Sequence, residues 1–153
     1  MFRIDSRNFD DILNIDHKFT GCVIDTEGDK AWYLNGKCHR TDGPAVEHAN
    51  GDKGWYRHGK FHREDGPAVE YTDGDKSWYL HGLKHREDGP AYESDRGRYR
   101  YEEWWQYGEL HREDGPAIID ELNGTKYWYL NGKSTTEQHV MRLHKLKGFI
   151  NGN

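Results

Sequence analysis

One fourteen-residue pattern recurs along this chain of 153 residues and constrains its fold more than any other feature. The pattern reads W-Y-x-x-G-x-x-H-R-x-D-G-P-A, and a variable link connects each copy to the next. The first three copies begin at Trp32, Trp55 and Trp78, 23 residues apart, and the fourth begins at Trp104, 26 residues further on. A fifth, partial copy begins at Trp128 and stops after WYLNGK. A repeat of this period predicts a stack of small units whose neighbours share one core.

Each copy contains two turn signals between short β-prone runs. The first is Asn-Gly, at Asn35-Gly36 and Asn131-Gly132, and His-Gly or Tyr-Gly occupies the same place in the other copies. Asn-Gly favours a two-residue β-hairpin, because both central positions need positive φ. The second signal is Asp-Gly-Pro, in which an Asx-capable side chain, a permissive glycine and a fixed proline send the chain out extended. Breaks such as Asn50-Gly51-Asp52 then return the chain to the next Trp-Tyr strand.

These signals predict an all-β fold, a stacked β-hairpin repeat array with about two short strands in each repeat and a short helical cap at each end. The expected N-terminal cap, a short helix and a strand, covers residues 1–27. Four complete repeats and one partial repeat cover residues 28–133. A C-terminal helix and tail cover residues 134–153.

Both caps are predicted from local patterns. The segment SRNFDDILNID places Phe9, Ile12, Leu13 and Ile15 at roughly helical spacing after Ser6. At the other end Ser134-Thr135-Thr136-Glu137 fits a capping box. The basic residues of HVMRLHKLK then fall in the last expected turn, before Gly148. We expect this helix to lie over the open edge of the last repeat.

Alternation along the Trp-Tyr strand sorts the aromatic residues into two columns on opposite faces. We expect the tryptophans that open the copies to lie in the interior with an alanine column, Ala45, Ala68, Ala91 and Ala117. The residue after each tryptophan should form the other column, either as a second packed face or as an aromatic binding surface. This second column is Tyr33, Tyr56, Tyr79, Trp105 and Tyr129.

The string HREDGPA begins at His62, His85 and His111, and the near copy HRTDGPA begins at His39. His and Asp could ligate a metal or act in catalysis, and stacking would bring the copies close together. The alternative is a structural ladder, in which Asp accepts backbone N–H bonds and Arg pairs with Glu or Asp of the adjacent repeat. We favour the ladder, because every copy is embedded in the same turn. The turn residues that we also predict to contact a partner are His62, Arg63, His85, Arg86, His111 and Arg112.

The segment NGKCHRTDGPAVEHANGDKGWY carries N-G-K-x-H, a following Gly and a later Gly before an aromatic strand. In these features it resembles the MORN family, and more closely the family's variant repeats, over about two thirds of the chain. It departs in placing three residues between the His and the next Gly, where MORN repeats usually have Gly directly after His. The resemblance implies stacked β-hairpins used for protein or lipid contact, without common catalytic residues. Chains with WYLNGK and HRxDGPA units also resemble phage and large-virus proteins, which would make the partner a host factor or a defence component.

Charge and composition exclude several other classes. The net charge is −5, and the residues from Thr135 onward carry +2, so the rest of the chain is net acidic and lacks the basic stripe of a nucleic-acid binder. No apolar run resembles a signal peptide or a membrane span, so we expect no membrane contact and a cytoplasmic location, the host cytoplasm for a viral protein. Cys22 and Cys38 form no metal or redox motif, and we expect reduced thiols. No phosphate-binding or nucleophile motif is present.

We therefore predict a non-enzymatic scaffold, without cofactor or metal, that binds a protein partner through a repeated aromatic and charged surface. The alternative is a protein that binds a small ligand, a nucleotide or a metal ion, in equivalent pockets between repeats. A hydrolase-like enzyme with a His/Asp pair is a third candidate. WYLNG also resembles the aromatic hairpins of choline- and glucan-binding repeats, which would imply a carbohydrate ligand. Stoichiometry separates the first two, because repeated pockets bind several ligands and a protein interface binds one partner.

Overall fold

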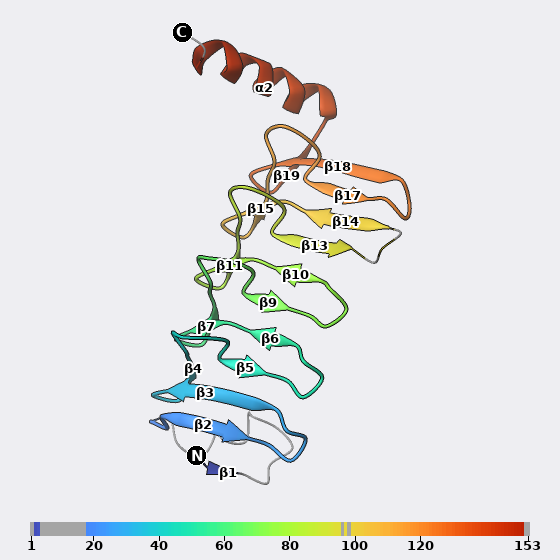
Figure 1. The fold of residues 1–153 in the computed structure, drawn as a ribbon. Helices are drawn as coiled ribbons and strands as arrows, with labels where there is room; N and C mark the ends of the chain where they lie inside the picture. The colour runs from blue at the N-terminus through green and yellow to red at the C-terminus, as the bar shows by residue number, and fades with distance from the viewer. Residues whose placement is uncertain (1, 4–17, 96, 98, 152–153) are drawn as a thin grey trace. The chain divides into compact units, whose positions relative to one another are not determined.

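The computed structural model describes residues 2–3, 18–95, 97 and 99–151 (Figure 1). By its contacts the chain divides into two compact units, one ending at Gly82 and the other beginning at Leu83. Apart from one helix, the described residues form short β-strands joined by turns, which confirms the all-β hairpin array. The predicted N-terminal helix, with Phe9 to Ile15, lies outside the described residues.

The first unit is a sheet of short strands with hairpins attached to it. Its strands are β1 (Phe2–Arg3), β2 (Gly21–Ile24), β3 (Lys30–Leu34), β4 (Lys37–Cys38), β5 (Val46–Glu47), β6 (Lys53–Gly54), β7 (Tyr56–Arg57), β8 (Lys60–Phe61), β9 (Val69–Glu70), β10 (Lys76–Ser77) and β11 (Tyr79–Leu80). The sheet has the order β1-β2-β3-β5-β6-β9-β10. β1 pairs with β2 in parallel, and the other pairs in this order are antiparallel. β4 and β8 form hairpins with β3 and β7.

The second unit repeats this arrangement and ends in a helix. Its elements are β12 (Leu83–Lys84), β13 (Tyr92–Asp95), β14 (Arg100–Glu103), β15 (Trp105–Gln106), β16 (Glu109–Leu110), β17 (Ile118–Asp120), β18 (Thr125–Leu130), β19 (Lys133–Thr135) and α2 (Glu137–Asn151). The sheet order is β13-β14-β17-β18-β19, all antiparallel, and β15 and β16 form a separate hairpin. The segments that follow Gly-Pro therefore form strands in both units, as predicted.

The hairpin turns have the geometry that Asn-Gly predicts. Asn35 and Gly36 have φ values of 51° and 70°, as a two-residue turn of this kind requires. The same pair of positive values recurs in the other copies, at His58-Gly59, His81-Gly82, Tyr107-Gly108 and Asn131-Gly132. Positive φ is uncommon for His and Tyr, so these turns need support from outside the hairpin.

The Trp-Tyr strand is interrupted at the tryptophan in three of the copies, at Trp55, Trp78 and Trp104. Trp55 lies between β6 and β7, and its backbone N–H donates to the Ala68 carbonyl at 2.8 Å. Trp104 lies between β14 and β15 in the same way, bonded to the Ala117 carbonyl at 2.7 Å. The chain leaves the sheet at this residue and enters the hairpin. These repeats therefore contain four short strands, where we expected two.

The two aromatic columns differ from the prediction. The alanine column is fully buried, as expected, at Ala45, Ala68, Ala91 and Ala117. The prediction that the tryptophans lie in the interior is wrong, because all five are only half-buried: Trp32, Trp55, Trp78, Trp104 and Trp128. In β3 the buried side chains are Ala31 and Tyr33, which pack with Val23 and Val46. Trp32 points to the other face of that strand, so the first repeat buries its tyrosine in place of its tryptophan.

Helix α2 forms as predicted but with different ends. Thr136 caps it, since its Oγ1 accepts the His139 N–H at 3.3 Å, so Ser134 is not the cap. The helix continues through Gly148 to Asn151, and no basic residue lies in its last turn. Val140 is fully buried and the helix contacts β18, which follows β17 and precedes β19 in the sheet. Among the described residues, no helix is long and apolar enough to cross a membrane.

Candidate functional site

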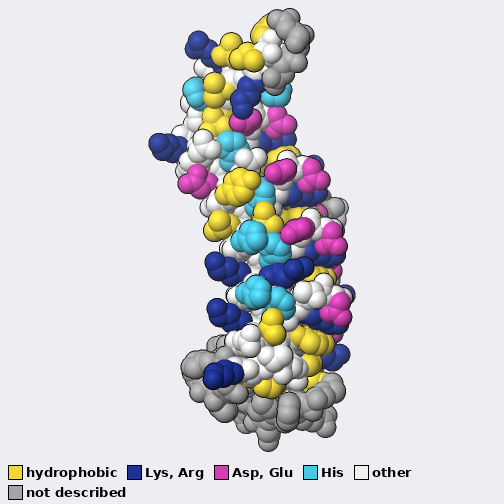
Figure 2. Space-filling view, turned by 90° about the vertical axis from the view of Figure 1, so that its left-hand side faces the viewer, with side chains coloured by type: hydrophobic (Ala, Val, Ile, Leu, Met, Phe, Trp, Pro, Cys, Tyr) yellow, Lys and Arg dark blue, Asp and Glu magenta, His cyan; other side chains and the backbone are white. Residues whose placement is uncertain are grey.

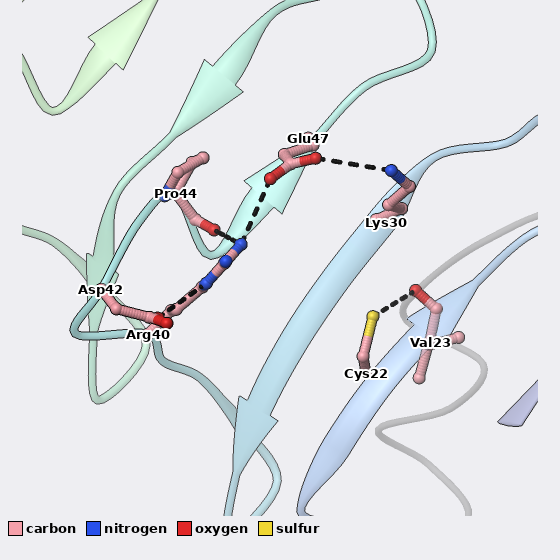
Figure 3. Close-up of polar contacts among 7 residues, drawn as sticks. All are labelled: Cys22, Val23, Lys30, Arg40, Asp42, Pro44 and Glu47. Atoms are coloured by element: carbon pink, nitrogen blue, oxygen red, sulfur yellow. Dashed lines mark hydrogen bonds and ion pairs between the residues drawn. The ribbon is translucent and has the colours of Figure 1, made fainter. Parts of the chain in front are cut away.

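The HRxDG turn closes around its arginine. In the first copy, Arg40 Nε donates to Asp42 at 2.9 Å, and Arg40 Nη1 donates to the Pro44 carbonyl and to Glu47, each at 3.2 Å (Figure 3). The guanidinium also lies over the ring of Trp32, 4.1 Å from its centroid. A planar guanidinium can make all these contacts at once, because its N–H donors point outward in its own plane while its flat face stacks on the tryptophan ring.

The same contacts recur in the later copies. Arg63 donates to Asp65, Pro67 and Glu70, Arg86 to Asp88, Pro90 and Glu93, and Arg112 to Asp114 and Pro116. Ile119 stands where the fourth copy would need the last carboxylate. The ladder between adjacent repeats that we predicted for these arginines is therefore wrong. Each arginine pairs within its own repeat, because the carboxylate two residues later folds back onto it, as does the carboxylate seven residues later in the first three copies.

The same guanidinium explains the glycine of the turn. A Cβ atom at Gly66 would lie 3.0 Å from Arg63 Cζ, and one at Gly89 would lie 2.7 Å from Arg86 Cζ. Neither glycine has positive φ. The turn therefore needs glycine for the space that the guanidinium occupies, and the permissive backbone that we expected is not the reason.

The histidine of each turn joins its repeat to the next. The N–H of His58, at the first position of the following hairpin turn, donates to His39 Nδ1 at 3.2 Å, and the two rings stack with centroids 4.4 Å apart. The corresponding bonds run from His81 to His62 (3.1 Å), from Tyr107 to His85 (3.3 Å) and from Asn131 to His111 (3.0 Å). This bond and this stacking support the positive φ of the hairpin residues.

These bonds determine the protonation that the fold needs. Because Nδ1 accepts an N–H, it carries no proton in this arrangement, and the ring proton sits on Nε2. Nε2 of His62 faces Glu64 at 3.3 Å, which favours the same tautomer. Burial, with the charges of His58 and Arg57 nearby, lowers the pKa of His39. Among the described residues, no group of three or more His, Cys, Asp or Glu side chains is placed to hold a metal ion.

Two successive HRxDG turns, with Trp55 and Arg57 between them in the sequence, line a groove. The first groove has a volume of about 590 Å³ and is lined by Arg40, Thr41, Asp42, Gly43, Trp55, Arg57, His62, Arg63, Glu64 and Asp65. Glu64 and Asp65 have 79% and 85% of their side-chain surface exposed. Figure 2 shows His side chains next to Asp and Glu side chains within the unit that holds this groove. The groove is therefore an open, strongly polar surface.

The second groove lies in the second unit and has a volume of about 260 Å³. It is lined by Arg86, Glu87, Trp104, Gln106, His111, Arg112, Glu113, Asp114 and His144. Eight of these residues hold the same repeat positions as residues of the first groove. The ninth, His144, belongs to α2.

The predicted binding residues fall into two sets. His62 and Arg63 line the first groove, and Arg86, His111 and Arg112 line the second, while His85 stacks on Tyr107. The aromatic column lies elsewhere: Tyr33 is buried, and Tyr56, Tyr79, Trp105 and Tyr129 are half-buried. Their carbonyls accept the N–H of Arg40, Arg63, Arg86 and Arg112 from the preceding repeat. This column holds the repeats together more than it offers an open aromatic surface.

Burial shifts the pKa of one residue of this column and of one cysteine in β2. Burial raises the pKa of Tyr56 to about 12, so its hydroxyl stays protonated at neutral pH. Burial also raises the pKa of the Cys22 thiol, whose Sγ contacts the Val23 carbonyl at 3.7 Å (Figure 3). A protonated thiol is a poor nucleophile, so Cys22 has no features of a reactive cysteine.

Sequence reasoning missed several residues of the grooves. Trp55 lines the first groove because it is half-buried, and we had assigned it to the core. Arg57 also lines it, and one signal could have found this residue. The other copies have Leu34, Leu80, Gln106 and Leu130 at its position, so Arg57 is the cation in a column of uncharged residues.

No protein-family model matches this chain, and no curated protein matches it significantly.

Proposed function

We propose that this protein is a non-catalytic scaffold that binds a protein partner through the charged side of its HRxDG turns. The proposal depends on one observation: exposed carboxylates lie over side chains that internal hydrogen bonds hold in place. Glu64 and Asp65 are mostly exposed, while Arg63 and His62 beneath them are held by internal bonds. A charged surface that is already ordered loses little conformational entropy on binding.

The mixed charge of the first groove favours a protein over a phosphate-bearing ligand. Arg40 and Arg63 line it, but Asp42, Glu47, Asp65 and Glu70 already neutralise them. Arg57 is the remaining arginine among the lining residues, whereas a nucleotide would need several cations that are free to meet its phosphates. A protein surface with both signs of charge can complement such a groove, and complementary charge improves specificity and association rate.

A small organic ligand in the grooves is the second candidate. The first groove, at about 590 Å³, has the size of ordinary ligand sites. A thermal-shift screen with nucleotides and sugars tests it, because a ligand at 100 times its dissociation constant stabilises the native state by about 2.7 kcal/mol. A clear shift would favour this candidate over the protein partner.

Affinity purification from cells of the source organism tests the protein partner. The bait is the whole chain in three forms: unchanged, Glu64→Lys, and the matched control Glu27→Lys. Both substitutions replace an exposed glutamate by lysine, but Glu27 lies away from the grooves, in the turn between β2 and β3. We expect one protein to be enriched by the unchanged chain and by Glu27→Lys, and to fall at least tenfold with Glu64→Lys. Equal recovery by all three would rule out the turn surface as the binding surface.

A further inference from the structure

Two residues of the chain's own helix α2 meet the second groove. His144 of α2 lines the groove, and Lys147 Nζ donates to Glu113 at 2.6 Å. His144 and Lys147 are three residues apart, so they lie on the same face of α2. The bond from Lys147 lowers the pKa of Glu113. Glu113 and Asp114 are 46% and 53% exposed, well below the values for the corresponding residues of the first groove.

The first groove has corresponding residues, and no helix is present among the described residues of its unit, 2–3 and 18–82. Trp55, His62, Arg63 and Glu64 occupy the repeat positions of Trp104, His111, Arg112 and Glu113. The first groove is also the larger of the two, at about 590 Å³ against about 260 Å³. What differs between them is the helix and a small number of side chains.

We propose that the first groove receives a helix of the partner protein, with a lysine or arginine that pairs with Glu64 as Lys147 pairs with Glu113. This inference rests on the proposed function and specifies the kind of partner. The helix lies across two successive HRxDG turns, and its basic residue follows the groove-filling residue by three positions.

Two differences between corresponding residues of the grooves indicate that the partner helix differs from α2. Arg57 stands where the second groove has Gln106, and Thr41 stands where it has Glu87. At these two positions the first groove gains a cation and lacks a carboxylate, although Asp42 brings its lining carboxylates to three, as in the second groove. The partner helix therefore carries an acidic residue against Arg57 in addition to the basic residue against Glu64. A helix with both charges fits the first groove better than α2 of a second copy does.

Peptides added to the whole, isotope-labelled chain test this inference by NMR. The first is a helix-stabilised peptide with the sequence of residues 136–151, and the second is the same peptide with His144→Glu, which supplies the acidic residue. We expect both to shift the amide signals of Thr41, Arg57 and Glu64. The His144→Glu peptide should bind at least threefold more tightly, and Arg57→Gln in the protein should remove that difference.

A charge exchange makes the test specific. Glu64→Lys in the protein should weaken binding of the His144→Glu peptide at least tenfold, and adding Lys147→Glu to that peptide should restore most of the loss. The inference is wrong if millimolar peptide shifts no signal of the first groove, or if only signals around Glu113 move. It is also wrong if the whole chain forms dimers that depend on Glu64 and Lys147, because α2 of a second copy would then be the occupant.

The same variants separate this inference from the proposed function. If Glu64→Lys abolishes capture of a partner while no peptide binds the first groove, the partner-binding surface stands and the helix is wrong. If the peptides bind as expected and no partner depends on Glu64, the groove recognises helices but the proposed function fails.

Discussion

The two kinds of turn in each repeat obey very different sequence rules. The HRxDG turn is repeated almost letter for letter, whereas the return turns at the other end of the strands read HANGD, YTDGD and DELNG. In the HRxDG turn each side chain has a partner: the arginine meets carboxylates and tryptophan, the glycine makes space for it, and the histidine binds the next repeat. A return turn needs only a glycine at positive φ, such as Gly51 at 99° or Gly74 at 96°, and a local Asx bond.

The difference teaches where repetition in a sequence comes from. Interlocked side chains must all be kept together, so the HRxDG string cannot drift one residue at a time. The return turns also link adjacent repeats, since Asp29 and Asp52 accept the N–H groups of Ala49 and Thr72, each at 2.8 Å. Such a link depends on one carboxylate and leaves its neighbours free to vary.

Removing an arginine should have the largest effect. Arg63→Ala takes away the bonds to Asp65, Pro67 and Glu70 and the cover of Trp55, so we expect the free energy of unfolding to fall by about 2–3 kcal/mol. Urea denaturation measures this. The matched control Arg57→Ala, exposed and without an ion pair among the described residues, should cost less than about 0.5 kcal/mol. Equal losses in the two variants would mean that the internal bonds of the turn contribute little.

The glycines of the two turns should respond differently to alanine. Gly66→Ala should cost about 1–3 kcal/mol, because its Cβ displaces the Arg63 guanidinium. In the Arg63→Ala background the same change should cost almost nothing. Gly74→Ala meets no atom within 4 Å but has φ of 96°, so its cost should be the same in both backgrounds. A double-mutant cycle in urea checks both statements, and additive costs for Gly66 and Arg63 would contradict the steric explanation.

Acid should weaken the two turns over different pH ranges. Burial and nearby charge lower the pKa of His39 in the fold, so the unfolded chain binds this proton more readily. Its contribution to stability is complete above about pH 6.5 and is lost as the pH falls through the folded pKa. Burial alone would raise the pKa of Asp29, but bonds from Ala49 and His48 lower it. Its contribution is therefore complete above about pH 3.9 and is lost below that, as the pH falls through the folded pKa.

Denaturation at pH 7.5, 6 and 5 checks the higher range. His39→Asn removes the titrating ring but keeps an oxygen that can accept the His58 N–H. The fall in unfolding free energy between pH 7.5 and 5 should be smaller in this variant than in the unchanged chain. An identical fall in both would mean that His39 makes no pH-dependent contribution.

A local Asx bond in a return turn should matter least. Asn50 accepts the Asp52 N–H and donates to the Asp52 carboxylate, each at 2.9 Å, in an exposed turn. Asn50→Ala should lower the free energy of unfolding by only about 0.5 kcal/mol, measured in the same urea series. A loss as large as that of Arg63→Ala would remove the distinction between the turns.

The sequence was sufficient for the features that glycine and proline specify. The hairpin turns, the strands after Gly-Pro and the buried alanine column follow from local chemistry and from the period. It was not sufficient to predict that Arg40 covers the ring of Trp32. Alternation indicates which residues share a face of a strand, but not which face an arginine side chain will cover. The grooves were predicted only as pockets between repeats, since their walls come from turns more than twenty residues apart. Arg57 is marked only by comparison with the same position of the other copies, and no local pattern marks Lys147, which bonds to Glu113.

Because each groove is enclosed by two successive turns, neither turn contains a binding site by itself. A single repeat could fold its turn correctly and still have no groove in which a partner could bind. Inserting one whole repeat would add one turn and, with it, one new groove whose residues are already specified. Binding in such a chain therefore depends on pairs of neighbouring repeats, and duplicating a repeat would add a groove without the design of a new site.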